Sequence, residues 1–105
     1  MSELIKDMQV NVRRIAVKSY NEGLVAGTSG NVSLYDHENE VMAITASNLD
    51  YSIMEAEDVV IMKLDGTIIE GKHKPSSEWQ MHAEVYKARK DINAVIHTHG
   101  PYATS

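Results

Sequence analysis

Residues 32–45 read Val32-Ser33-Leu34-Tyr35-Asp36-His37-Glu38-Asn39-Glu40-Val41-Met42-Ala43-Ile44-Thr45. The first four residues alternate between apolar and polar side chains, which is typical of a strand with one buried face. The polar residues 36–40 predict a turn, and the apolar run 41–45 predicts a returning strand. Because a short turn joins the two strands, we expect them to pair antiparallel. This stretch therefore predicts a β-hairpin.

A second hairpin is predicted further along the chain. Residues 58–64 form a β-branched apolar run, Asp65-Gly66 has the chemistry of a tight turn, and residues 67–69 supply the second strand. A last strand pattern at 94–96 leads into His97-Thr98-His99, where Gly100-Pro101 breaks it. These segments predict a mostly antiparallel sheet.

Two helices are predicted beside these strands. Residues 2–21 carry apolar side chains at alternating spacings of three and four, and Gly23 is a suitable helix stop. Residues 76–89 show the same pattern directly after Pro75. The order helix, hairpin, hairpin, helix, strand predicts an α/β fold.

Composition limits the functions that this chain can have. Its 105 residues suit one small domain, with 43% hydrophobic and 24% charged residues. The net charge of -5 argues against nucleic acid as a partner, and cysteine is absent, so a metal site must use His and carboxylate. We find no signal peptide and no apolar run long enough for a membrane helix. We therefore expect a cytoplasmic protein without a membrane partner.

Two histidines suggest a metal site. His97 and His99 lie two apart on a predicted strand, so both imidazoles face the same side and can bind one zinc ion. They are otherwise simply two histidines at an exposed strand end. Glu78, in the first turn of the second helix, can bring a carboxylate to the same place. Alone, it is equally a helix-start carboxylate.

Two segments can bind an anion. Ser76 and Ser77 stand where the second helix begins and its backbone N–H groups are free, although such serines commonly act as caps. The loop 27–31 can form a nest of N–H groups or a plain glycine turn. His82, one helical turn after Glu78, either supports the site or packs in the core. We expect His37 and His73 to face solvent.

The ordered set of motifs resembles the class II aldolase/adducin family, and within it the L-fuculose-1-phosphate aldolase branch. It comprises Gly27-Thr28-Ser29-Gly30-Asn31-Val32-Ser33, Ile44-Thr45-Ala46-Ser47, Glu70-Gly71, Pro75-Ser76-Ser77-Glu78-Trp79 and His97-Thr98-His99. The resemblance implies a three-layer fold in which helices flank the central sheet. It also implies that residues 1–105 are the N-terminal part of a single domain, here truncated. Family chains continue and supply a third zinc histidine, a tyrosine acid and further strands, so we expect weak zinc binding and no activity from this chain alone.

The resemblance implies a lyase that cleaves a ketose 1-phosphate into dihydroxyacetone phosphate and an aldehyde, as in fucose degradation. One zinc ion per subunit would be bound by Glu78, His97 and His99, with Glu78 also acting as the catalytic acid/base. A homotetramer is implied as well. Asn48 departs from the glycine usual in the family. The implied phosphate-binding residues are Thr28, Gly30, Asn31, Ser47, Asn48, Ser76 and Ser77.

Other activities on the same scaffold remain open alternatives. An L-ribulose-5-phosphate 4-epimerase usually has aspartate at the position of Glu78, so the glutamate favours an aldolase. A methylthioribulose-1-phosphate dehydratase is a more distant enzyme alternative. An adducin-like head would be a non-catalytic interaction module, and such modules tend to lose the zinc ligands that His97, His99 and Glu78 represent here.

Overall fold

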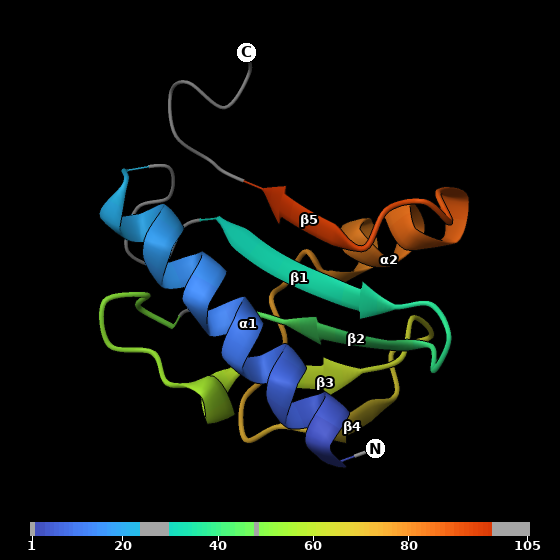
Figure 1. Cartoon of the computed structure of the whole chain (residues 1–105), viewed down its shortest axis with the longest axis horizontal. Helices are drawn as coiled ribbons and strands as arrows, with labels where there is room; N and C mark the ends of the chain where they lie inside the picture. Colours follow the sequence, from blue (N-terminus) through green and yellow to red (C-terminus); the bar gives the residue numbers. More distant parts are fainter. Residues whose placement is uncertain (1, 24–29, 48, 98–105) are drawn as a thin grey trace.

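A five-stranded sheet forms the middle of the computed structural model, which describes residues 2–23, 30–47 and 49–97. The strand order is β4-β3-β2-β1-β5, and all neighbouring strands pair antiparallel (Figure 1). The predicted antiparallel sheet is therefore confirmed. The strands span Asn31–Asp36 (β1), Val41–Ile44 (β2), Val60–Met62 (β3), Ile68–Glu70 (β4) and Ala94–His97 (β5).

Helix α1, Ser2–Asn21, covers one face of the sheet, in front of the strands in Figure 1. Its apolar stripe buries Ile5, Met8, Val12 and Ala16 against alternate residues of the central strands. The helix ends where predicted, because Gly23 has a φ of 78°, a left-handed conformation that glycine adopts without strain. Neither described helix has the length and apolar character needed to cross a membrane.

Helix α2, Trp79–Ala88, lies on the opposite face, behind the sheet in Figure 1. Tyr86 packs there with Met42 and Ile44, whereas Val41 and Ala43 of the same strand pack toward α1. Successive side chains of β2 thus point to opposite faces of the sheet and pack into two separate cores. The three-layer architecture is confirmed.

Helix α2 starts later than the sequence predicts, at residue 79 rather than 76. Its approach is a turn in which the Ser76 carbonyl accepts the Trp79 N–H at 3.0 Å. The backbone of Ser76 itself pairs with the sheet, since its N–H donates to the Thr45 carbonyl at 2.9 Å. Glu78 consequently occupies the N-cap position of α2 instead of its first turn.

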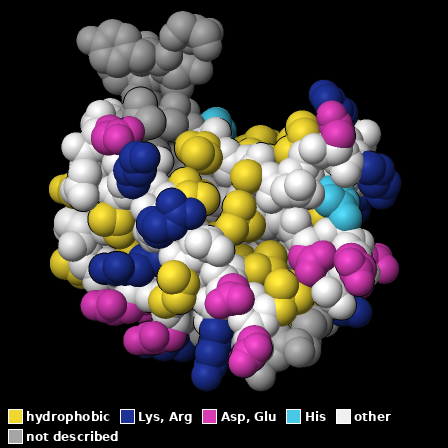
Figure 2. Space-filling view, in the orientation of Figure 1, with side chains coloured by type: hydrophobic (Ala, Val, Ile, Leu, Met, Phe, Trp, Pro, Cys, Tyr) yellow, Lys and Arg dark blue, Asp and Glu magenta, His cyan; other side chains and the backbone are white. Residues whose placement is uncertain are grey.

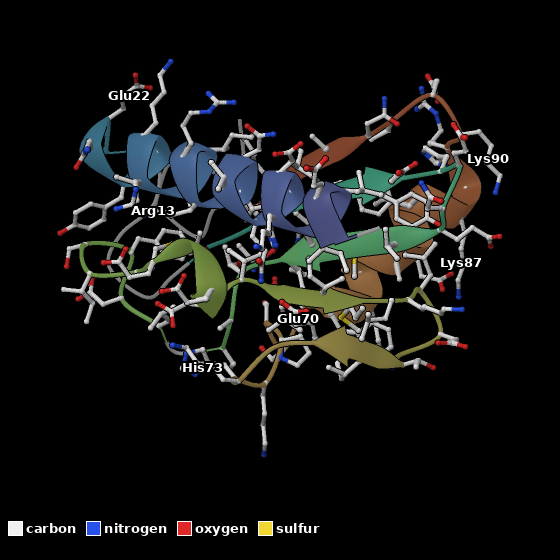
Figure 3. The ribbon with its side chains drawn as sticks, turned by 60° about the horizontal axis from the view of Figure 1, so that its bottom comes forward. Arg13, Glu22, Glu70, His73, Lys87 and Lys90 are labelled. Atoms are coloured by element: carbon white, nitrogen blue, oxygen red, sulfur yellow. The ribbon has the colours of Figure 1, made fainter. Side chains whose placement is uncertain are left out.

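A 3-10 turn at Ala56–Asp58 precedes β3 and shortens the strand predicted for residues 58–64. The Asp58 carboxylate accepts the Glu55 N–H at 2.8 Å and contacts His73 Nε2 at 2.8 Å. Burial opposes ionisation of Asp58, but these hydrogen bonds and the charge of Lys72 lower its pKa below the ordinary value. Figure 3 shows His73 in the loop after β4. His73 is exposed, as expected, and its ring also contacts the Asp58 carboxylate.

Candidate active site

One end of the sheet gathers four segments that are distant in the sequence. The first residue of β1, Asn31, pairs with His97 at the end of β5. Next to them, Thr45 donates its N–H to the Val32 carbonyl at 3.0 Å, just beyond the end of β2. An isolated bridge then joins Ala46 to Pro75, directly before the turn that leads into α2. The antiparallel register therefore brings most of the described candidate residues to one edge.

The central contact at this edge joins Glu78 and His97. His97 Nδ1 lies 2.7 Å from Glu78 Oε1, and the two side chains are 37% and 29% exposed. Glu78 comes from the N-cap of α2, where the partial positive charge of the helix terminus stabilises a carboxylate. Both groups are half-buried, so a ligand can still reach them. The structure thus brings together two of the three expected metal ligands.

Three predicted site residues lie outside the part of the chain that the structure describes. These are Thr28 in the glycine loop, Asn48 after β2, and His99 beyond β5. Their roles stay predictions.

The other predicted phosphate-binding residues surround the Glu78–His97 contact in different environments. Gly30, with a φ of 87°, accepts the hydroxyl proton of Tyr51 on its carbonyl at 3.0 Å. Ser47 donates its N–H to the Lys74 carbonyl at 2.9 Å, and Ser76 Oγ accepts the Glu78 N–H at 3.2 Å. Ser76 is thus buried and its hydroxyl stabilises the turn ahead of the N-cap residue Glu78, while Ser77 is exposed.

A buried polar network leads from this edge into the core. Asn31 Nδ2 donates to Glu78 Oε1 at 3.3 Å, and Asn31 Oδ1 contacts His82 Nε2. His82 Nδ1 lies 2.6 Å from Ser33 Oγ, which lies 2.8 Å from the Tyr86 hydroxyl. The hydroxyl also donates to the Ser33 carbonyl at 3.1 Å. These contacts link the core to the carboxylate of the candidate acid/base.

Sequence patterns carry only partial signals for this network. The two readings of His82, a support of the site or a core residue, are compatible in the structure, where it is buried and contacts Asn31. The sequence does not single out Ser33 and Tyr86 as members of this network. The signals that could have found them are the inward polar position of Ser33 on an alternating strand and the spacing of four between His82 and Tyr86.

Burial holds the network in its neutral protonation states. The side chain of His82 is 0% exposed, and desolvation, with a smaller contribution from the nearby His97, lowers its pKa from 6.5 to about 4; Glu78 acts in the opposite sense. Burial likewise raises the pKa of Tyr86 to about 12. At neutral pH the imidazole and the phenol are therefore both uncharged.

The donor set at the sheet edge suits zinc. Glu78 and His97 supply one carboxylate oxygen and one imidazole nitrogen from two rigid elements, and zinc accepts both kinds of ligand. Residues 2–23, 30–47 and 49–97 contain no group of three His, Asp or Glu side chains placed to hold a metal. The third ligand expected from the sequence, His99, lies outside these ranges.

A hollow of about 580 Å³ lies between α1 and the 3-10 turn, away from the candidate residues, and its lining includes Val10, Arg13 and Glu57. Figure 3 shows Arg13 extending from α1 toward this turn, where its Nε donates to the Met54 carbonyl at 3.0 Å. On the face that α1 covers, basic and acidic side chains are interspersed (Figure 2). That face therefore lacks the single-sign basic surface typical of nucleic-acid binding.

Comparison with known proteins agrees with the motif order. Residues 11–105 match the family model described as Class II Aldolase and Adducin N-terminal domain. A 5-deoxy-D-ribulose 1-phosphate aldolase from Bacillus thuringiensis serovar kurstaki is 51% identical over 86 residues, which cover 82% of this chain and 40% of that protein.

Solved structures share the fold. A structure of L-fuculose 1-phosphate aldolase superposes with a TM-score of 0.87 at 41% identity, covering 93% of this chain and 46% of that one. An L-fuculose-1-phosphate aldolase from Thermus thermophilus gives a TM-score of 0.70 at 28% identity, covering 90% and 47%. The chain thus spans less than half the length of these relatives.

Proposed function

Because the chain belongs to the class II aldolase and adducin family, we propose that it carries part of a zinc-dependent active site that cleaves a ketose 1-phosphate into dihydroxyacetone phosphate and an aldehyde. The relatives it resembles are named aldolases acting on L-fuculose 1-phosphate and 5-deoxy-D-ribulose 1-phosphate. Both names describe ketoses phosphorylated at carbon 1, so we assign this substrate class to the present protein.

The observation that carries the proposal is the contact between Glu78 and His97 at 2.7 Å, at an edge of the sheet where several phosphate-binding candidates meet. A carboxylate and an imidazole placed together can hold a metal ion. The carboxylate can also move a proton when it is not bound to the metal. We propose His97 and Glu78 as two metal ligands within the described residues, and His99 as the third ligand outside them.

The reaction requires one bond to break and two proton transfers, one away from the carbon 4 hydroxyl and one onto carbon 3. When the bond between carbons 3 and 4 breaks, the carbon 4 hydroxyl loses its proton and becomes the aldehyde, and carbon 3 gains a proton to complete dihydroxyacetone phosphate. We assign the proton at carbon 3 to Glu78. Zinc, when bound, supplies Lewis-acid polarisation of the substrate oxygens and stabilises negative charge on them.

The segments around Glu78 would hold the phosphate. Ser47 and Ser77 are partly or fully accessible and lie in segments joined through the Ala46–Pro75 bridge. Hydroxyl groups and backbone N–H groups there can donate to phosphate oxygens without any basic side chain. We assign the same role to Thr28, Gly30, Asn31, Asn48 and Ser76. A homotetramer with one zinc per subunit, located in the cytoplasm, completes the proposal.

The choice of glutamate at position 78 favours an aldolase over an epimerase-like enzyme, which usually carries aspartate there. The retained Glu78–His97 pair disfavours an adducin-like module without catalytic activity. These two alternatives predict different outcomes in one experiment.

The test combines turnover with metal content, using protein expressed from its complete coding sequence. With zinc, we expect dihydroxyacetone phosphate from L-fuculose 1-phosphate or 5-deoxy-D-ribulose 1-phosphate, detected by a coupled dehydrogenase, and no epimer from L-ribulose 5-phosphate. His97→Ala should lose the bound zinc, whereas His37→Ala, after the far end of β1, should retain it. Zinc content unaffected by His97→Ala, or epimer as the sole product, would contradict the proposal.

A further inference from the structure

The direction of each hydrogen bond in the buried network follows from Glu78. A carboxylate can only accept hydrogen bonds, so the Asn31 amide must turn its NH₂ group toward Glu78 Oε1, 3.3 Å away. The carbonyl end of the same amide then faces His82 Nε2. Because a carbonyl oxygen only accepts, Nε2 must carry the proton of the imidazole. The opposite amide orientation would place two oxygen atoms against each other.

The remaining contacts agree with the same assignment. With its proton on Nε2, neutral His82 has a lone pair on Nδ1, which accepts the Ser33 hydroxyl proton at 2.6 Å. The Tyr86 hydroxyl in turn donates toward Ser33, whose hydroxyl oxygen lies 2.8 Å away and whose carbonyl oxygen lies 3.1 Å away. Every donor in this series therefore faces an acceptor, and no two N–H or O–H groups point their protons at each other.

Burial makes this arrangement costly to change. Ser33, His82 and Tyr86 are 0% exposed, and Asn31 is 3% exposed. Reversing one member would leave at least two buried polar atoms without partners, and water has no access to replace them. Asn31 is thus held from one side by the core and presents its amide to Glu78 on the other.

We propose that His82 is a positioning residue, which as the Nε2-protonated neutral tautomer orients the Asn31 amide and thereby holds the carboxylate of Glu78 at the sheet edge. The importance of this role for catalysis rests on the proposed function, in which Glu78 is the catalytic acid/base. It also makes Asn31 a link between the carboxylate and the core, in addition to its proposed phosphate contact.

The first test is the tautomer itself, measured by NMR on the chain labelled with ¹⁵N at histidine, without metal and at neutral pH. We expect the Nε2 resonance of His82 to show a directly bonded, slowly exchanging proton, and the Nδ1 resonance to show none. A proton on Nδ1, or a mixture of both tautomers, would overturn the inference. This measurement needs neither zinc nor substrate.

The second test separates positioning from packing by zinc affinity, measured by competition with a chelator. His82→Gln keeps a side-chain N–H donor for Asn31 and should retain affinity. His82→Phe fills similar space without a donor and should weaken zinc binding by about 10- to 100-fold, as is usual when a group that orients a ligand is removed. Met81→Gln, at a neighbouring and 37% exposed position of the same helix, should leave affinity unchanged.

These outcomes distinguish the two proposals. Equal affinity of the wild type, His82→Gln and His82→Phe would refute positioning by His82 even if the protein is a zinc enzyme. A wild type that binds no zinc would refute the proposed function, and the tautomer measurement would still decide the inference. If His82→Phe fails to fold, loss of zinc affinity in His82→Gln refutes positioning through the donor, and retention supports it.

Discussion

Acid should destabilise the folded chain through His82 before it affects the carboxylates. The pKa of His82 falls from 6.5 to about 4 in the folded state, chiefly because its side chain is fully buried. Unfolded protein therefore binds this proton more readily than folded protein, and stability falls as the pH drops from about 6.5 toward 4. The total effect is about 3 kcal/mol, of which about 2 kcal/mol is lost by about pH 5.

The assay is urea unfolding at a series of pH values in EDTA, so that no metal contributes. Asn31 and Ser33 contact the His82 ring and carry no charge, while Glu78 and His97 act on its pKa in opposite directions. Carboxyls with lowered pKa values, such as Asp58, lose their contribution only below about 3.8, so the two windows separate.

A substitution tests whether the effect belongs to His82. His82→Gln removes the titrating group while keeping an amide, so its free energy of unfolding should change much less between neutral pH and about pH 5. Met81→Gln places the same residue at the neighbouring position, 37% exposed, and should retain the wild-type pH dependence. If His82→Gln loses as much stability in acid as the wild type, the assignment of the buried neutral imidazole is wrong.

Three further predictions concern the scaffold. Val12→Ala should lower the free energy of unfolding by about 2 kcal/mol, because Val12 is 0% exposed under α1, whereas Val10→Ala at a 54% exposed position should change it little; denaturant midpoints compare them, and equal losses would contradict the assigned face of α1. Asp58→Asn should cost about 1 to 2 kcal/mol at neutral pH by weakening its contacts with Glu55, Lys72 and His73, and the difference from wild type should shrink as pH falls below 3.8; a constant difference would exclude the carboxylate charge as its cause. Gly66→Ala should destabilise more than Gly23→Ala, by about 1 kcal/mol or more in thermal unfolding, because an added Cβ at Gly66 would lie 3.1 Å from the Trp79 ring while Gly23 has open space; the reverse order would refute the close approach.

Local patterns predict most of the fold because the relevant physics is local. The three-and-four spacing of α1 predicts its buried face, and the alternation of residues 32–35 predicts a strand. The structure has both elements, although the polar Ser33 of that strand is itself buried. The start of α2 is misplaced for a reason that lies elsewhere in the chain. Pro75-Ser76-Ser77 resembles a helix start, but the Thr45 carbonyl and the Ala46–Pro75 bridge hold this backbone beside the sheet.

The sequence predicts only those residues of the candidate site that lie within a short, recognisable motif. Glu78 and His97 can be found because each lies in a recognisable sequence pattern. The partners of other histidines come from distant segments: His73 meets Asp58, His37 Nε2 lies 2.7 Å from the Ile92 carbonyl, and His82 meets Ser33. His73 is exposed and His37 is half-buried, so both retain solvent contact as expected, but the sequence does not predict their polar partners. Spacing within one sequence cannot supply such pairings.

The position of β5 sets the order in which this site can be assembled. Strands β1 to β4 follow one another as hairpins, whereas β5 pairs back onto β1, so His97 meets Asn31 across 66 positions of chain. During synthesis the four-stranded meander can form while the ribosome still holds the later residues, because its contacts are short-range. The carboxylate and the imidazole meet only after the last strand has docked. Metal affinity should consequently appear only in the last step of folding, when β5 docks. It should be lost in the first step of any unfolding that begins at that edge.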